Sequence, residues 1–211
     1  MARSIMHWIN PDCLPEIEGR FERFLLNPHG EADGMILAGG VEVHFPPHLA
    51  GALRAALEED AAGPLRIRGV RPRRGDVFAA VAFETAKGAR IIDNGPPKKD
   101  EREKGDKRGR EKRAPMAIDG VVRRPLHGPK GEARGALLED GRIVRFAPDE
   151  APRLKALLTP GARLSARGEG LATALGTVVE AREIGPSAAA LQPVKAKAPK
   201  PDKPRGHEAY A

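Results

Sequence analysis

The sequence has little of what often stabilises or equips a small protein: one cysteine, eight aromatic residues and no long apolar run. A single cysteine, Cys13, excludes an intrachain disulfide framework and a cysteine-cluster metal site. The few aromatic residues limit the area that a core can bury, so aliphatic side chains must supply most of the packing. No segment has the roughly 20 apolar residues that a membrane span needs, and the N-terminus lacks a signal-peptide core. We therefore expect a soluble, cytoplasmic protein without a membrane partner.

What the sequence does contain is an internal duplication. Residues 17–82 return, 101 positions further on, as residues 118–182. The identical residues at this spacing include glycines, a proline and core-type residues, and chance does not produce such a register. Examples are Arg23 and Arg124, Pro28 and Pro129, Gly40 and Gly141, Val43 and Val144, and Phe45 and Phe146. Any account of the chain must therefore explain two copies of one module.

Each copy is predicted to fold as three strands, a short helix and two strands. Period-two alternation and Gly-Gly or Asn-Pro turns delimit the strands, and a proline followed by leucines at helical spacing predicts the helix. The predicted strands are 19–26, 32–37, 41–45, 65–68 and 76–83 in the first copy and 120–126, 133–138, 142–146, 163–168 and 176–183 in the second. The predicted helices are 46–60 and 150–158. This order is typical of the OB-fold, a five-stranded Greek-key barrel with a helix between strands three and four.

The run RFLLNPHGEADGMILAGGVEVHFPPHLAGAL carries a resemblance to a known group of proteins. It resembles uncharacterised bacterial proteins with tandem OB-fold-like repeats of the nucleic-acid-binding type. The resemblance covers both copies, about two thirds of the chain. It implies the fold and a bacterial source, and it implies no catalytic residue.

These patterns predict an all-β chain with one short helix per module: two tandem OB-like barrels joined by a disordered charged linker. The predicted parts are an N-terminal arm at 1–15, module 1 at 16–94, a linker at 95–115, module 2 at 116–185 and a disordered basic Ala/Lys/Pro tail at 186–211. The net charge of +7 comes wholly from the linker and the tail, because the rest of the chain has as many acidic as basic residues. We therefore expect the excess positive charge on the linker and the tail more than in a groove of a barrel.

The best candidate for binding is the segment RIRGVRPRR. It places five guanidinium groups within nine residues of the fourth strand and the loop after it: Arg66, Arg68, Arg71, Arg73 and Arg74. Arginine pairs with phosphates and stacks on bases, which favours contact with single-stranded nucleic acid or RNA. The alternative is a charged, solvated strand edge. The second copy has GEGLATALG at the matching place, without arginine.

Other functional patterns are scarce. Phe45 and Phe146 fall on the inward side of their strands and are predicted to lie in the cores, and His44 and His48 are interpreted as surface residues. No phosphate-binding loop, metal motif or nucleophile motif occurs, so we expect no enzyme, cofactor or metal. We therefore predict a non-enzymatic binding protein that binds single-stranded nucleic acid or RNA through module 1. The alternatives are a protein-interaction adaptor, with a protein as its partner, and a small-ligand-binding protein that uses a barrel mouth.

Overall fold

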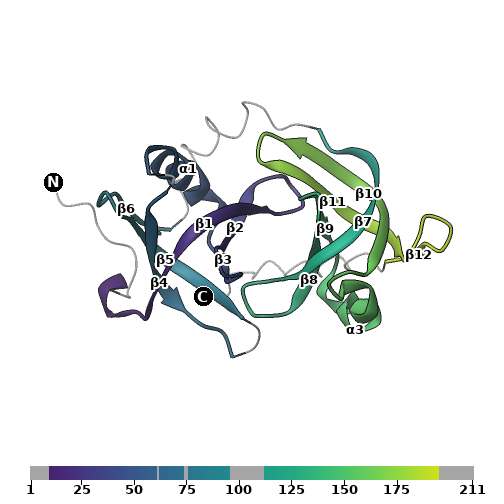
Figure 1. Cartoon of the computed structure of the whole chain (residues 1–211), viewed down its shortest axis with the longest axis horizontal. Coiled ribbons are helices and arrows are strands. Elements are labelled where there is room, and N and C mark those ends of the chain that lie inside the picture. The colour runs from purple at the N-terminus through teal and green to yellow at the C-terminus, as the bar shows by residue number, and fades with distance from the viewer. Residues whose placement is uncertain (1–9, 61, 74–75, 96–111, 195–211) are drawn as a thin grey trace, which may run out of the picture.

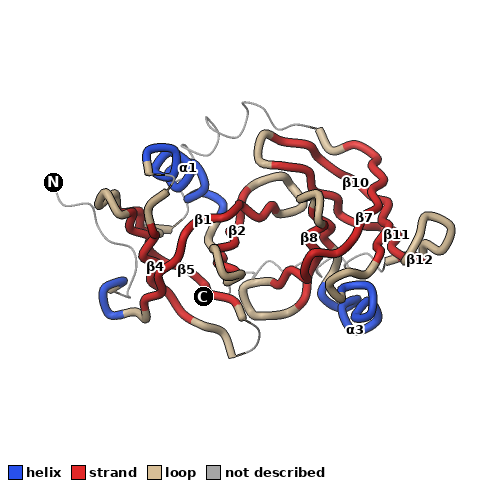
Figure 2. Tube along the Cα trace, viewed as in Figure 1, coloured by secondary structure: helices blue, strands red, loops and turns tan. Residues whose placement is uncertain are grey.

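A computed structural model describes residues 10–60, 62–73, 76–95 and 112–194. This part of the chain is mostly β-structure, arranged as two bodies side by side with one short helix on each (Figure 1 and Figure 2). Within it, no helix is long and apolar enough to cross a membrane. Trp8 and the rest of the predicted arm up to residue 9 lie outside the described residues.

Five of the six strands in the first sheet close into a barrel, and the sixth pairs outside the ring. The strands of this sheet are β1 (Glu16–Leu26), β2 (Ala32–Leu37), β3 (Glu42–His44), β4 (Pro64–Val70), β5 (Val77–Thr85) and β6 (Arg90–Ile92). They pair in the order β3-β2-β1-β4-β5-β6, and a parallel pairing of β3 with β5 closes the ring. Helix α1 (Ala50–Glu59) follows a 3₁₀ turn at Pro47–Leu49 and buries Leu53 and Leu57. The predicted order of strands and helix is confirmed for this module.

The second sheet repeats these pairings. Its strands are β7 (Ala114–His127), β8 (Ala133–Leu138), β9 (Ile143–Arg145), β10 (Arg163–Thr173), β11 (Gly176–Gly185) and β12 (Gln192–Pro193). The order is β10-β7-β8-β9-β11-β12, and β10 also pairs with β11. The register is the same as in the first copy, since Glu42 lies opposite Val77 and Ile143 lies opposite Val178. Helix α3 (Ala151–Leu154) continues into a 3₁₀ turn at Lys155–Leu158 and ends before Pro160, which disfavours helical backbone at its preceding residue.

Several boundaries differ from the prediction. The segment GEGLATALG, predicted as a loop, is mostly strand, because β10 runs to Thr173 and β11 begins at Gly176. The predicted linker ends earlier than expected: Ala114 and Pro115 belong to β7, where a proline is tolerated at the start of a strand. The start of the predicted tail holds β12, whose Gln192 pairs with Ile184. Residues 96–111 and 195–211, which carry the remaining linker and tail predictions, lie outside the described residues.

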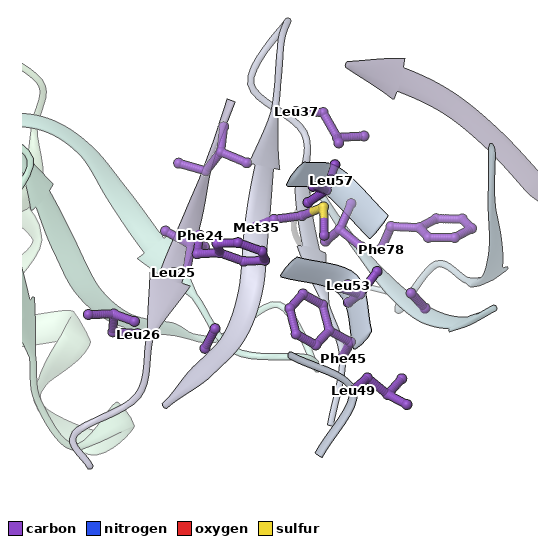
Figure 3. Close-up of a cluster of buried hydrophobic side chains, with 14 of the residues drawn as sticks. Phe24, Leu25, Leu26, Met35, Leu37, Phe45, Leu49, Leu53, Leu57 and Phe78 are labelled. Carbon is purple, nitrogen blue, oxygen red and sulfur yellow. The ribbon is translucent and has the colours of Figure 1, made fainter. Parts of the chain in front are cut away.

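The apolar core of the first barrel extends into the second module. Leu25, Met35 and Leu53 pack at its centre (Figure 3). The same cluster also contains side chains of the second module, namely Leu126, Leu137, Ile143, Leu171 and Val178. A separate cluster, which includes Val144 and Phe146, forms the core of the second module. The two modules are therefore joined by buried apolar side chains.

Candidate functional site

The arginines of the RIRGVRPRR segment are largely committed to acidic neighbours. Arg66 donates to Glu84 at 2.6 Å, and Arg68 donates to Glu16 at 2.8 Å and also to Asp12. These pairs form because β4 lies between β1 and β5, whose outward positions carry the carboxylates. Arginines that neighbouring carboxylates already neutralise attract a phosphate backbone less strongly.

The other predicted arginines lie after β4. Arg71 donates to Asp76 at 3.3 Å, and its guanidinium lies 5.7 Å from the centre of the Phe78 ring. Arg73 is exposed, and Arg74 lies outside the described residues. Of the four predicted arginines that the structure describes, Arg66, Arg68 and Arg71 are thus paired with carboxylates, and Arg71 and Arg73 are exposed after the strand.

The phenylalanines offer no stacking platform beside these arginines. The prediction that Phe45 and Phe146 lie in the cores is confirmed, since they are 4% and 5% exposed. The other four phenylalanines are also buried or half-buried, and Phe21, Phe24, Phe45 and Phe83 contact one another through their rings. Base stacking on any phenylalanine other than the half-buried Phe21 would therefore require a module to open.

The contact between the modules has the signature of a two-fold axis. Arg23 donates to the carbonyl oxygen of Gly141 at 2.8 Å, and the equivalent Arg124 donates to the carbonyl oxygen of Gly40 at 2.6 Å. Arg23 thus makes the same contact with the second module that its equivalent, Arg124, makes with the first, as in an isologous dimer. Both glycines have positive φ, +89° and +87°, and both backbones are approached closely by the opposite arginine. The duplicated sequence therefore folds as a pseudo-symmetric pair.

The axis passes near a position where the two copies differ in charge. Arg123 donates to Glu22 at 2.5 Å, and these two residues occupy equivalent places in the duplication. A pair of identical copies would bring like charges together at this point, which is unfavourable. The Glu22 and Arg123 pair therefore favours contact between unlike modules.

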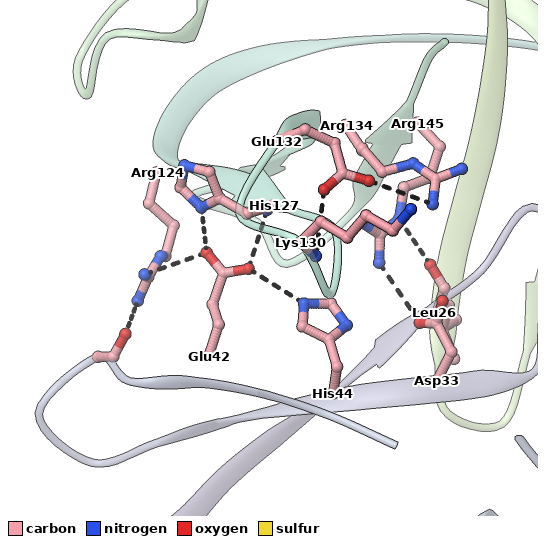
Figure 4. A network of polar contacts seen from close by, with 11 residues as sticks. Leu26, Asp33, Glu42, His44, Arg124, His127, Lys130, Glu132, Arg134 and Arg145 are labelled. Atoms are coloured by element: carbon pink, nitrogen blue, oxygen red, sulfur yellow. Dashed lines mark hydrogen bonds and ion pairs between the residues drawn. The ribbon is translucent and has the colours of Figure 1, made fainter. Parts of the chain in front are cut away.

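On one side of the axis, a buried carboxylate lies among an arginine and two histidines that come from both modules (Figure 4). Glu42 is 0% exposed and accepts hydrogen bonds from the backbone N–H and the ring Nδ1 of His127, both at 2.9 Å. Arg124 lies 3.3 Å from the carboxylate and His44 lies 3.8 Å from it. Burial alone would raise the pKa of Glu42, but the hydrogen bonds from His127 and the nearby ring of His44 outweigh it and lower that pKa to about 2. The equivalent residue, Ile143, belongs to the shared apolar cluster.

The interpretation of His44 as a surface residue is wrong, and that of His48 is confirmed, since His48 is exposed. His44 is 6% exposed because β3 packs into the contact between the modules. His48 lies on the outer side of the 3₁₀ turn, 3.1 Å from Asp93. The two prolines between the histidines turn the chain, so the two side chains lie in different environments.

Two adjoining cavities lie along the contact between the modules. The larger has a volume of about 450 Å³ and the smaller about 440 Å³. Asp33, His44, Pro129 and Arg134 line both of them. The remaining polar lining of the larger cavity consists of Asn27, His127, Arg145, Glu180 and Arg182, and that of the smaller one of Asp93.

The two cavities are equivalent under the duplication. Each of the residues that line the smaller cavity has its equivalent, 101 positions away, in the lining of the larger one. Asp33 and Arg134 are equivalent to each other, and they lie in both cavities. His44 in the smaller cavity corresponds to Arg145 in the larger, and Asp93 corresponds to Val194. Divergence of the two copies has therefore given one original cavity two different chemical linings.

In the larger cavity, a buried arginine and a half-buried aspartate form an ion pair without a hydrogen bond between them. Arg145 is 6% exposed; its Nε donates to the carbonyl oxygen of Leu26 at 2.9 Å, and its Nη2 lies 3.5 Å from Asp33. Burial lowers the pKa of Arg145, although an arginine stays protonated in a protein. Burial raises the pKa of Asp33, against the opposing effect of Arg145. The site therefore keeps a buried guanidinium and a half-buried carboxylate close together without a direct hydrogen bond between them.

Sequence reasoning missed this region, although two signals point to it. The runs Gly34–Leu37 and Gly135–Leu138 are continuously apolar, which is typical of strands that are buried on both faces. The duplication also exchanges Asp33 for Arg134 within otherwise matching strands. Together these features indicate that the second and third strands meet a partner, with charges that differ between the copies.

Within the described residues, no group of three or more His, Cys, Asp or Glu side chains is placed to hold a metal ion. Cys13 is exposed and free. Among known proteins, neither a family model nor a curated protein matches the chain. The functional argument therefore rests on the residues of this chain alone.

Proposed function

We propose that the chain is a non-enzymatic binding protein of two OB-like barrels, and that its ligand site is the pair of cavities between them. The equivalence of the two cavities carries this proposal. Concave sites of this size, lined by apolar groups and a few converging polar ones, are typical of small-molecule sites. Here Asp33, His44 and Arg134 converge from both modules.

The strand order supports the OB-like assignment. The ring β1-β2-β3-β5-β4, with a helix between β3 and β4, is the order of that fold. The second sheet has the same pairings, which supports a second barrel. OB-folds bind oligonucleotides through the face of strands two and three and the adjoining loops. In this chain the other module covers β2 and β3, so the cavities are what remains open beside that face.

The experiment is a screen of small molecules by amide NMR on the full-length chain. We expect saturable shifts at amides that line the cavities, such as those of Asn27, Asp33 and Gly128. Ala147 lines the larger cavity, so Ala147→Trp fills space there and should abolish binding. The matched control is Ala55→Trp on the exposed side of α1, which should bind as the wild type does. Equal binding by Ala147→Trp, or shifts only elsewhere on the surface, would overturn the proposal.

A second candidate function is the binding of single-stranded nucleic acid or RNA by module 1. The observation that favours it is the exposure of Val70, Arg71 and Arg73 at the connection between β4 and β5, because this loop frames the ligand in OB-folds. Val70 is 46% exposed. Such binding would weaken steeply with salt. It should also fall in an Arg71→Ala, Arg73→Ala double variant and be unchanged in Arg54→Ala, a similarly exposed arginine on α1.

The adaptor hypothesis gives a different outcome of the same test. A protein partner that binds an apolar surface would tolerate both salt and the loss of these arginines. Salt-insensitive, arginine-independent association would therefore contradict the nucleic-acid candidate and favour a protein partner.

A further inference from the structure

We propose that the larger cavity binds an oxyanion, the phosphate or carboxylate group of a small ligand, between Arg145 and Arg134. The inference rests on the proposed function and names the chemical class of its ligand.

Arg145 has more hydrogen-bond donors than partners. Its side chain lies in the larger cavity and carries five N–H donors, of which the Nε–H bonds to Leu26. Its buried Nη2 makes no hydrogen bond within the described residues, since Asp33 lies 3.5 Å away. A buried donor without a partner is costly, and such groups often mark the place of an ion or ligand. The planar fork of an arginine matches the two oxygens of a carboxylate or phosphate.

Arg134 supplies a second cation from β8, the strand that pairs with the strand of Arg145. Its side chain is 42% exposed, and its ion pair with Glu132, close to it in sequence, is long at 3.9 Å. Arg182 adds a third guanidinium to the lining, although it is paired with Glu169 at 2.8 Å. Of the two acidic residues in the same lining, Glu180 is bound to Arg113 at 2.5 Å. The cavity therefore has an excess of positive charge that an anion would balance.

Asp33 lies beside Arg145, where the anion would bind, but its interaction with Arg145 is weak. Its Oδ1 is buried and makes no hydrogen bond within the described residues. Burial raises the pKa of this carboxyl group, which shows that its charged form is poorly stabilised where it lies. An incoming oxyanion that bonds directly to Arg145 would compete with Asp33. Removal of the Asp33 charge should therefore strengthen the binding of an anion.

The smaller cavity shows why the site is specific to one side. At the place of Arg145 it has His44, which is directed to Glu42. At the place of Arg134 it has Asp33 itself, and Asp93 replaces Val194. This lining has one arginine where its equivalent has three, and the same number of carboxylates, so it attracts an anion less strongly. The duplication thus provides an internal comparison for the larger cavity.

The test measures binding of inorganic phosphate, succinate and an oligothymidylate to the full chain by calorimetry and thermal unfolding at constant ionic strength. We expect saturable binding of phosphate or succinate that raises the unfolding temperature. Arg134→Ala should weaken this binding by about tenfold, since it removes a charge-assisted contact. Arg163→Ala is the matched control, because Arg163 is 71% exposed and lies 3.7 Å from Asp119. Neither residue lines the cavity. Asp33→Asn should bind the anion several-fold more tightly.

The outcomes separate the inference from the proposed function. Binding of phosphate with succinate inert identifies a phosphoryl ligand, and the reverse identifies a carboxylate ligand. Absence of saturable binding by both small anions would overturn the inference, as would equal binding by Arg134→Ala and the wild type. If uncharged or cationic molecules still shift the amides at the cavity, the proposed function survives while the inference falls. Binding of the oligothymidylate alone, sensitive to Arg71 and Arg73, would overturn the inference and favour the second candidate.

Discussion

Replacement of Glu42 by glutamine tests the contact between the modules at its most polar point. The carboxylate is fully buried and is held by His127, Arg124 and His44. Glutamine has nearly the same shape but no charge, so the variant leaves the packing in place and removes the interaction with the cations. Because Glu42 and His44 belong to the first module and Arg124 and His127 to the second, the loss should weaken the contact between the modules.

The magnitude follows from the pKa of Glu42. A fall from 4.5 in the unfolded chain to about 2 in the folded one corresponds to about 3 kcal/mol of stability. The pKa is depressed in the folded state, so this stability is fully present above pH 4.5 and is lost as the pH falls towards 2. At neutral pH, the Glu42→Gln variant should therefore unfold with a free energy about 3 kcal/mol lower than that of the wild type.

The assay is urea unfolding of the full chain at several pH values between 7 and 2. The difference between wild type and Glu42→Gln should shrink as the pH falls, because protonation removes the charge from the wild type as well. Taking the difference cancels the other carboxyl groups, including Asp33. Glu84→Gln is the control, since Glu84 lies on the surface and pairs with Arg66. A Glu42→Gln variant as stable as the wild type at pH 7, or a difference that does not depend on pH, would refute the reasoning.

Three further substitutions test other parts of the account by the same unfolding measurement. Leu137→Ala, in the shared apolar cluster, should cost about 3 kcal/mol, and a cost below 1 kcal/mol would contradict its place there. Gly141→Ala should cost about 1 to 2 kcal/mol, because φ is +87° and a Cβ would lie 2.9 Å from Arg23 Nη1; an unchanged stability would show that the turn relaxes. Arg66→Ala should cost less than about 1 kcal/mol, as for exposed ion pairs, and a larger loss would indicate a structural role.

Much of the fold could be predicted because each strand follows a simple pattern. The second strand of each copy, Ala32–Leu37 and Ala133–Leu138, has the predicted bounds. Alternation placed Val43 and Phe45 inside the barrel, and both are buried. Strands β6 and β12 were missed because a strand of three or two residues is too short for periodicity to register.

The candidate site could not be predicted in the same way. Periodicity identifies which face of a strand is buried, but it does not identify what covers the second face of β2 and β8. The cavities arise from pairs such as Asp33 and Arg145 that lie far apart in the sequence and meet only when the modules pack. The clustered arginines at 66–74 gave a stronger sequence signal, although on β4 the neighbouring strands already supply their partners.

Calorimetry of the full chain tests the central claim most directly, namely that the two modules fold as one unit around a shared core and the cavities beside it. The account predicts a single thermal transition whose calorimetric and van't Hoff enthalpies agree. It also predicts that Leu137→Ala lowers the temperature of this one transition without splitting it. Two separate transitions, or a calorimetric enthalpy about twice the van't Hoff value, would show that the modules unfold independently and would contradict the account.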